Sequence, residues 1–510
     1  MEQTKQYDIF EKIYVGRSDG NPFTDYDISA VFRSKNETKT IRGFYDGNGK
    51  YIVRFMPNYE GEYSYSVSGS FCDGCDFEAE DLNGTFNVLP HSPSDHGPVS
   101  VYNKYHFAHA DGTPYYSVGT TCYVWELKDD GLIEQTLDSL KQAGFNKIRF
   151  CIFPKHYLYN ITEPRSYPFE GKPMNSSVIT PDNFMDFDYR TEGNEWDLTR
   201  FNPEHFRHIE YCIRRLKEIG VEADLILLHP YDRWGFSNLP RDVEKRYLDY
   251  VISRFAAFSN VWWSMANEFD ILPDRTDDVW KFYGEYVRDN DPYGHPRSVH
   301  NCLRIYDHSE DWVTHVSYQR MDLYKTAEDT DRLREQYGKP VVLDEIAYEG
   351  NIQCGWGDIS GEEMVRRFWE GAMRGGYPGH GETFLSDDGI LWWSHGGRLK
   401  GESHKRVRFL IDILHDTPGC GLKKIYKEWD CVTAVPEDER LGEDTGYRID
   451  YYSFMRPGFR DFYLDDSQEY EVEVIDTWNM TIDKTGIFKG RFRVMLPGRP
   501  YMAIRLKKIL

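Results

Sequence analysis

The amino-acid sequence predicts an α/β protein, a (β/α)8 TIM barrel flanked by an N-terminal and a C-terminal β-sandwich. Three observations carry this prediction. Short strands of alternating polarity fill both ends of the chain, and apolar strands alternate with amphipathic helices between them. The glycine-rich fingerprints of nucleotide-binding sheets are absent, which disfavours an open doubly wound sheet, the main structural alternative for the central part.

The N-terminal domain is expected over residues 1–95. Its runs alternate apolar and polar residues and are broken by Gly, Asn and Asp, a pattern typical of an immunoglobulin-like sandwich. A Pro/Ser/Gly-rich linker, Leu89–Ser100, follows it. Cys72 and Cys75 form a CxxC spacing in this domain. Because no second pair lies nearby, we interpret it as a loop rather than a zinc or redox site.

The barrel is expected over residues 101–424. Asn202-Pro203 and the capping box Ser360–Glu363 mark helix starts, while Gly144 and Gly220 mark helix ends. The eight predicted strands lie in Tyr115–Trp125, Asn146–Phe153, Glu222–Pro230, Val261–Asp270, Pro296–Asn301, Val313–Gln319, Lys339–Ile346 and Gly389–Ser394. Residues 425–510 return to short strands and predict the second sandwich.

Composition narrows the classes of partner. The 510 residues carry a formal net charge of −23, which disfavours nucleic acid and anionic membranes, and no apolar run is long enough to span a bilayer. Aromatic residues make up 16% of the chain. Aromatic rings stack on sugar C–H faces, so this content suits a carbohydrate partner, although aromatic sandwich cores explain it as well.

The cysteines and the N-terminus bear on the compartment. The nine cysteines are odd in number and scattered, which fits a reducing environment. The N-terminal residues show no basic start followed by an apolar core. We therefore expect a cytoplasmic protein.

Two glutamates follow predicted barrel strands. Glu268 ends strand four and Glu345 ends strand seven, so about three βα units separate them and both reach the carboxyl face of the barrel. By strand alternation, Glu268 shares an inward face with Ser264 and Ala266. Alternation likewise groups Glu345 with Val341 and Leu343, and it points Asp344 away from the mouth.

Two carboxyl groups that face each other are the minimum that enzymatic glycoside hydrolysis requires. One carboxylic acid protonates the leaving oxygen, and the other carboxylate attacks the anomeric carbon or activates a water. The negative partner raises the pKa of the acid, so that both protonation states coexist near neutral pH. Either glutamate alone is better explained as a helix cap or an arginine partner, so the hypothesis depends on the pair.

The sequence resembles known glycosidases at these positions. Asn267-Glu268 and Glu345 resemble the motifs of the retaining (β/α)8 glycoside hydrolase clan, and Asp111–Glu126 and "WWSMANEFD" resemble the apiosidase-like family of β-sandwich-flanked glycosidases. The resemblance covers nearly the whole chain. It implies Glu268 as acid/base, Glu345 as nucleophile, retention of configuration, and exo-action on small oligosaccharides or plant glycosides. It also implies that Asn267 binds the sugar hydroxyl next to the anomeric carbon.

One departure from the family limits the comparison. Relatives often carry Gly-Asp-Thr-Ala-Trp in strand one, where this chain has Gly119-Thr-Thr-Cys-Tyr123. Substrate contacts from that strand are therefore not carried over.

Further residues at strand ends form a candidate supporting shell. Arg149 would keep the nucleophile ionised, with a structural ion pair as the alternative. His229 and His300 would bind sugar, with a satisfied core histidine as the alternative. Near the end of strand six, either the Tyr318 phenol would donate to the nucleophile or its neighbour Gln319 would bind sugar, since only one of them faces inward. On strand eight, Trp393 resembles the clan's platform under the cleaved sugar, with its neighbour Trp392 as the alternative. The loops Pro378–Phe384 and His229–Phe236 add His380, Glu382 and Trp234 near the mouth.

Two other classes of protein stay open. A metal-dependent barrel hydrolase usually needs His-x-His on strand one, where Val118–Thr121 contains no histidine, so we expect no metal and no cofactor. A non-catalytic carbohydrate-binding protein would suit the aromatic sandwiches but has no need of paired glutamates. The sandwiches would brace the barrel or mediate contacts in a homo-oligomer.

Overall fold

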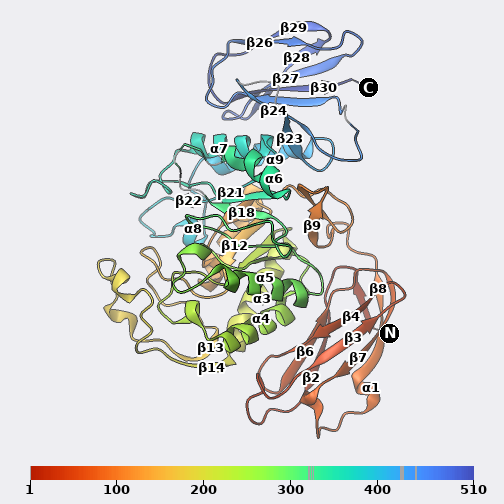
Figure 1. Cartoon of the computed structure of the whole chain (residues 1–510), viewed down its shortest axis with the longest axis vertical. Coiled ribbons are helices and arrows are strands. Elements are labelled where there is room, and N and C mark those ends of the chain that lie inside the picture. Colours follow the sequence, from red (N-terminus) through yellow and green to blue (C-terminus); the bar gives the residue numbers. More distant parts are fainter. Residues whose placement is uncertain are drawn as a thin grey trace.

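The chain folds into three parts, with the barrel between two β-rich domains (Figure 1). This computed structural model describes residues 2–319, 322, 324–325, 327–425, 430–442 and 445–509. The fold class predicted from the sequence is confirmed, because eight parallel strands form one sheet and antiparallel sheets flank it on both sides in sequence.

The N-terminal part is a two-sheet sandwich. One sheet has the order β1-β8-β7-β3-β4 and the other β2-β6-β5. The strands are β1 (Glu2–Lys5), β2 (Phe10–Val15), β3 (Ser29–Arg33), β4 (Thr38–Arg42), β5 (Phe44–Tyr45), β6 (Lys50–Phe55), β7 (Gly61–Ser68) and β8 (Asn83–Leu89), with a short helix α1 (Ala79–Leu82). Alternate residues point inward, and stacked rings such as Phe10 on Phe86, with centroids 3.8 Å apart, fill the space between the sheets.

The barrel sheet has the order β17-β16-β15-β12-β11-β21-β19-β18. Its strands are β11 (Gly119–Thr121), β12 (Lys147–Cys151), β15 (Glu222–Ile226), β16 (Val261–Ser264), β17 (Arg297–Ser298), β18 (Val316–Gln319), β19 (Val341–Glu345) and β21 (Tyr377–His380). The two end strands meet through the Thr314 N–H, which donates to the Arg297 carbonyl at 3.0 Å, and the Ser298 hydroxyl, which donates to the His315 carbonyl at 2.6 Å. The barrel is therefore nearly closed.

Helices cover the outside of the barrel. They are α2 (Asp130–Ala143), α3 (Pro203–Glu218), α4 (Arg241–Phe255), α5 (Asp277–Asn290), α6 (Thr330–Tyr337), α7 (Gly361–Met373) and α9 (Ser403–His415). The one-turn helix α8 (Trp392–His395) precedes α9. The predicted caps form as expected: the Ser360 hydroxyl accepts from the Glu363 N–H at 3.2 Å, and Gly144 ends α2 in the left-handed region. Loops add the hairpin β13 (Phe169–Lys172) and β14 (Glu195–Phe201) and the parallel pair β20 (Glu349–Gly350) and β22 (Glu382–Thr383).

The prediction for strand eight is wrong. Gly389–Ser394 is not a strand; it runs into the short helix α8, and strand eight is β21, which starts twelve positions earlier. β21 has the sequence Tyr-Pro-Gly-His, which carries little apolar signal. Glycine is required there because a Cβ at Gly379 would lie 2.5 Å from the Asp344 carbonyl oxygen of β19. The sequence of β21 is therefore determined by its close packing against β19 rather than by hydrophobic burial.

An apolar plug closes the bottom of the barrel. The hairpin β9 (Val99–Tyr102) and β10 (His106–His109) places Phe107 against Trp262 and Tyr377, with ring centroids 5.0 and 5.1 Å apart. Val342 belongs to the same buried cluster. The floor is therefore sealed by side chains, which leaves the carboxyl ends of the strands as the accessible face.

The C-terminal part is a second sandwich. Its sheets have the orders β23-β24-β25-β30-β27-β28 and β26-β29. The strands are β23 (Leu422–Ile425), β24 (Val432–Pro436), β25 (Tyr447–Tyr451), β26 (Phe459–Tyr463), β27 (Tyr470–Asp476), β28 (Thr481–Phe488), β29 (Arg491–Met495) and β30 (Met502–Lys508). The first strand thus begins slightly before the predicted boundary, and the domain lies over α7 and α9 (Figure 1). Within the described ranges, no helix has the length and apolar character needed to cross a bilayer.

Candidate active site

A cavity of about 320 Å³ opens at the carboxyl ends of the barrel strands. Both predicted catalytic residues, Glu268 and Glu345, line it. Its other lining residues are Tyr123, Lys155, Tyr157, Leu158, Tyr159, Tyr231, Cys302, Gln319, Ala347, Tyr348, Cys354, Trp356 and Trp393. A few polar groups converge among aromatic side chains, which is the usual character of a small-molecule site.

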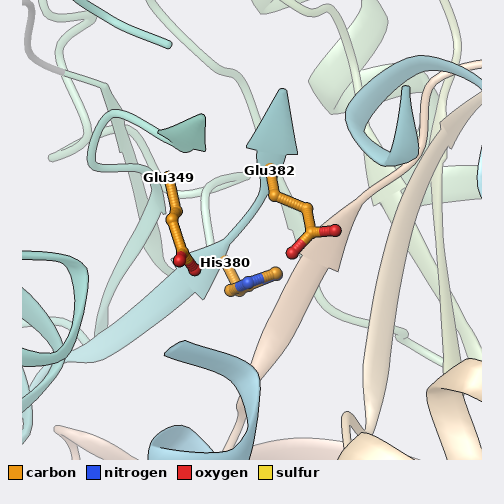
Figure 2. A group of neighbouring side chains, drawn as sticks. All are labelled: Glu349, His380 and Glu382. Atoms are coloured by element: carbon orange, nitrogen blue, oxygen red, sulfur yellow. The ribbon is translucent and has the colours of Figure 1, made fainter. Parts of the chain in front are cut away.

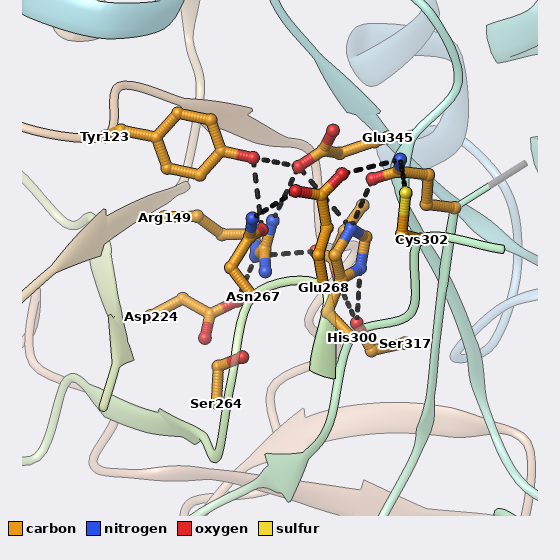
Figure 3. A network of polar contacts seen from close by, with 12 residues as sticks. Tyr123, Arg149, Asp224, Ser264, Asn267, Glu268, His300, Cys302, Ser317 and Glu345 are labelled. Carbon is orange, nitrogen blue, oxygen red and sulfur yellow. Dashed lines mark hydrogen bonds and ion pairs between the residues drawn. The ribbon is translucent and has the colours of Figure 1, made fainter. Parts of the chain in front are cut away.

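Glu345 is the last residue of β19 and is 8% exposed. Its Oε1 accepts a short hydrogen bond from the Tyr123 hydroxyl and lies 3.3 Å from Arg149 Nη1 and 3.4 Å from His300 Nε2 (Figure 3). Burial alone would raise the pKa of Glu345, but the hydrogen bond and charge of His300, then Arg149 and Tyr123, lower it to about 2. Glu345 is therefore an ionised carboxylate at neutral pH.

The hydrogen-bond partners of His300 place a proton on each of its two ring nitrogens. The Ser317 hydroxyl donates its one proton to Asp344 at 2.5 Å, so Ser317 Oγ accepts from His300 Nδ1 at 3.1 Å. His300 Nε2 faces two acceptors, Gln319 Oε1 at 2.8 Å and Glu345 Oε1. Both ring nitrogens then carry protons, and the imidazolium pairs with Glu345.

Glu268 lies four residues beyond the end of β16 and has a different environment. Its Oε2 accepts from the Tyr231 hydroxyl and from Asn267 Nδ2 at 3.3 Å, and its Oε1 accepts from Gln319 Nε2 at 3.0 Å. Among the described residues, no Lys, Arg or His forms an ion pair with it. Its backbone is left-handed, with φ 53°, a conformation that costs a non-glycine residue on the order of 1 kcal/mol and is typical of functional sites.

A buried charged layer lies beneath the two glutamates. Lys147 Nζ donates to Asp224 at 2.7 Å and to Asp344 at 2.8 Å, and Arg149 Nε lies 3.6 and 3.7 Å from the same carboxylates. Burial would raise the pKa of Asp344, but Lys147 and Arg149 hold it far below the usual range. This layer fixes Arg149 under Glu345.

The orientation predicted for Asp344 is wrong. Its side chain points into the barrel, on the same face of β19 as Val342. The cause is a β-bulge: Ser317 pairs with Val342 but Gln319 pairs with Glu345, so β19 has one extra residue. The bulge lets the neighbours Asp344 and Glu345 both face the barrel interior.

Several supporting residues occupy the predicted region. Gln319 lines the cavity and bonds both Glu268 and His300. Asn267 is fully buried, and its Oδ1 lies 3.1 Å from the Tyr123 hydroxyl oxygen, whose proton Glu345 accepts. Arg149 and His300 hold Glu345 rather than lining the cavity. Trp393 does line the cavity, although from α8 instead of a strand.

Two predicted residues lie elsewhere. The Tyr318 hydroxyl donates to Asp329 at 2.8 Å on the outer side of β18, because alternation turns Gln319 inward in its place. His229 is buried beside the site, where its Nε2 donates to the Phe153 carbonyl at 3.2 Å, and it does not line the cavity. Burial lowers the pKa of His229 to about 3, so it stays neutral.

The residues that the sequence did not predict are mainly aromatic. Tyr123 donates to Glu345, the role expected of Tyr318, and Tyr231 donates to Glu268. Tyr123 ends "GTTCY", the segment that departs from the family pattern, and Tyr231 lies directly after the predicted third strand. Position after a predicted strand is a usable signal for Tyr231 and for Lys155, which lies two residues past the predicted second strand. Tyr123 lies inside the predicted first strand, and Trp356 lies in a loop whose course the sequence does not indicate.

The loop residues His380 and Glu382 are buried and do not line the cavity, contrary to the prediction. With Glu349 they form a buried cluster whose donor atoms lie within 4.8 Å of one another (Figure 2). Glu382 accepts from the N–H groups of Lys400 and Gly401, and Glu349 from those of Glu402 and Ser403. These hydrogen bonds occupy both carboxylates and anchor the start of α9. Trp234 is likewise buried in the core and does not line the cavity.

The barrel with two glutamates facing one cavity defines the class: the protein is a glycosidase. Residues 102–405 match the apiosidase-like catalytic domain, and residues 3–70 and 429–507 match two domains of unknown function. The chain belongs to the apiosidase-like family.

Solved structures agree with this assignment. A "putative glycoside hydrolase" from Bacteroides vulgatus is 36% identical over the whole of both chains, with a TM-score of 0.89. A family 5 glycoside hydrolase from the same organism is 16% identical, covers 82% of this chain and 94% of its own, and has a TM-score of 0.61, which shows the shared fold. None of the curated protein sequences compared with this chain matches it.

Proposed function

We propose that this protein is an exo-acting, retaining glycosidase of small oligosaccharides or plant glycosides, with Glu345 as nucleophile and Glu268 as acid/base. The observation that supports it is the asymmetry of the two carboxyl groups in one cavity. Glu345 is paired with two cations and has a pKa of about 2, whereas Glu268 is held by neutral donors among the described residues. One group is therefore suited to attack and the other to carry a proton.

The reaction follows from these roles. A Glu345 oxygen attacks the anomeric carbon while Glu268 gives its proton to the glycosidic oxygen, and the aglycone leaves as an alcohol. The ionised Glu268 then takes a proton from a water molecule that attacks the same carbon and releases Glu345. Two inversions at one carbon retain the configuration. Asn267, between Tyr123 and Glu268, would bind the neighbouring sugar hydroxyl.

The size of the cavity supports exo-action. About 320 Å³ lies at the small end of the range for ligand sites, which suits one or two sugar units rather than a polymer. Tyr159 and Trp356, from two different loops, contribute to its lining. We also propose a cytoplasmic location, supported by nine cysteines that are all free.

The experiment compares Glu268→Gln with Glu345→Gln on a panel of 4-nitrophenyl glycosides, whose leaving group is good, and on the methyl glycoside of the sugar that wild type cleaves best, whose leaving group is poor. Glu345→Gln should abolish turnover. Glu268→Gln should lose about 10²–10⁴-fold on substrates with poor leaving groups, because the proton donor is missing. Azide should restore turnover to Glu268→Gln alone, by replacing water at the glycosyl-enzyme, and proton NMR of the first product should show the retained anomer.

The exposed Glu195→Gln variant is the matched control and should behave as wild type. Full activity in both active-site variants would overturn the residue assignment. An inverted first product would overturn the double displacement and leave glycoside hydrolysis itself intact.

A further inference from the structure

Lys155 is a charged residue that the proposed mechanism does not use. It follows β12, is 2% exposed, and lines the cavity together with Glu268 and Glu345. A lysine buried to this extent is rare unless it is paired. Its position in the same cavity raises the question of what its ammonium group binds.

Aromatic rings surround the ammonium group. Its Nζ lies 3.1 Å from the ring centroid of Tyr123, 4.2 Å from that of Tyr231 and 5.3 Å from that of Tyr157. Tyr123 and Tyr231 are the two residues whose hydroxyls donate to Glu345 and Glu268. Lys155 is therefore held between the supports of the two carboxyl groups, and cation–π attraction fixes it there.

The ammonium has no oxygen partner among the described residues. The other buried cations of the barrel do: Lys147 bonds Asp224 and Asp344, and Arg149 bonds Glu345. Three N–H donors of Lys155 remain without an acceptor in a cavity that has room for a ligand. Burial lowers the pKa of Lys155 to about 8, opposed by Cys151, Glu268 and Glu345, so it is mostly charged at neutral pH.

We propose that Lys155 is a substrate-binding residue whose ammonium donates hydrogen bonds to hydroxyl oxygens of the sugar held between Glu268 and Glu345. This inference rests on the proposed glycosidase function of the cavity. The aromatic rings fix the lysine in advance, so little side-chain freedom is lost when the sugar binds. The sugar hydroxyls would accept the hydrogen bonds for which the protein has no acceptor, and the C–H faces of the sugar would pack on the same aromatic rings.

The test uses Lys155→Met, which keeps the length of the side chain and removes its charge and donors. With the 4-nitrophenyl glycoside that wild type cleaves best, kcat/KM should fall about 10- to 100-fold, the effect of losing hydrogen bonds from a charged group. Monodeoxy analogues of that glycoside should lose reactivity with wild type at one ring position. At that position Lys155→Met should show no further loss.

Lys128→Met is the matched control. Lys128 is a half-buried lysine that donates to Asn160 at 2.7 Å and does not line the cavity. Its substitution should leave kcat/KM and the deoxy-sugar profile unchanged.

Thermal unfolding separates binding from a structural role. Removing an ammonium that lacks an acceptor relieves a desolvation cost, so Lys155→Met should unfold at the same or a higher temperature than wild type. A structural lysine predicts a lower unfolding temperature with an unchanged deoxy-sugar profile, and that result would overturn the proposal.

The pH dependence of binding gives an independent readout. In a Glu268→Gln background, which removes the acid/base carboxyl group, calorimetric affinity for the parent sugar should fall as the pH rises and Lys155 loses its charge. The fall should come below about pH 8, because the Glu268 charge that raises the pKa of Lys155 is missing in this variant. The double variant with Lys155→Met should show no such fall, and an equal fall in both would contradict the proposal. Activity that survives Glu268→Gln and Glu345→Gln but not Lys155→Met would instead contradict only the catalytic assignment.

Discussion

At the scale of single residues, the two glutamates differ in the charge beside them. Glu345 has Arg149 and the His300 imidazolium within 3.4 Å, whereas Glu268 is held by a phenol and two amides. Burial and the nearby carboxylates raise the pKa of Tyr123 and Tyr231 well above the ordinary value, so both phenols remain donors at any pH where the protein works. Each of the two carboxyl groups therefore accepts a hydrogen bond from a different tyrosine.

Tyr123→Phe should separate these contributions. The ring stays beside Lys155, but Glu345 loses a donor that favours its charged form, so its pKa should rise and the acidic limb of the kcat/KM profile should move to higher pH. We expect kcat/KM at neutral pH to fall about 10- to 100-fold. Tyr247→Phe, which removes a buried hydroxyl bonded to the Leu227 carbonyl, should leave the profile unchanged. An unshifted acidic limb in Tyr123→Phe would show that this hydroxyl does not tune Glu345.

The sequence contains enough to predict the two glutamates of the cavity and some of the residues that hold them, such as Arg149 and His300, but not all of them. Glu268, Glu345 and Arg149 follow from strand order alone, because strands of a barrel end on one face. The sequence suggests Tyr318 as the donor to Glu345, a hydrogen bond that Tyr123 makes instead, because alternation alone does not choose between Tyr318 and Gln319. Lys155 depends on a loop, and loop geometry follows from tertiary packing rather than from a periodic pattern.

At the scale of elements, deviations from regular strands decide the geometry of the site. The bulge in β19 brings both Asp344 and Glu345 to the interior, and a rule of strict alternation predicts the wrong side for one of them. The hydrophobic pattern does not predict strand eight, because β21 needs a glycine at position 379 for close approach to β19 and has little apolar character. Both errors arise where backbone contacts, which the hydrophobic pattern does not record, dominate.

The β20–β22 pair carries an unusual charge arrangement. Glu349 and Glu382 are directly paired across the two strands and are both buried (Figure 2). Burial, with a further contribution from Glu349, raises the pKa of Glu382 from 4.5 to about 7. A carboxyl group with a raised pKa binds its proton better in the folded chain. Its stabilising contribution is complete below about pH 4.5 and is lost as the pH rises through about 7.

Glu382→Gln should remove this dependence. The difference in free energy of unfolding between wild type and the variant should decrease as the pH rises from about 4.5 to 7, by at most about 1.4 kcal/mol per pH unit. Urea unfolding at several pH values measures it. Glu402→Gln alters an exposed carboxyl on the same segment whose pKa is lowered by Arg406, and its difference curve should be flat in this range. A flat curve for Glu382→Gln would show that Glu382 is ionised throughout.

At the scale of the whole molecule, both sandwiches are packed against the barrel. The C-terminal sheet joins the barrel core, where Tyr451 packs on Trp369 of α7 with ring centroids 5.3 Å apart. The N-terminal sandwich instead uses buried ion pairs. Arg54 binds Glu210 of α3 through two hydrogen bonds of 2.7 and 2.8 Å, and Arg254 of α4 lies 3.1 Å from the same carboxylate. These contacts favour the view that the sandwiches brace the barrel.

Glu210→Ala tests whether the N-terminal sandwich stabilises the barrel. Arg54 and Arg254 are 3% and 0% exposed, and removing this carboxylate leaves the two guanidinium groups close together without the charge between them. The free energy of unfolding should therefore fall by about 3–5 kcal/mol. The matched surface variant Glu134→Ala loses a half-exposed partner of Arg215 and should cost at most about 1 kcal/mol. Since Glu210 lies on the outside of the barrel and the cavity lies at its carboxyl end, kcat/KM at 25 °C should be unchanged in both. A loss in Glu210→Ala no larger than in Glu134→Ala would show that the domains are stable independently, and the bracing role would then be wrong.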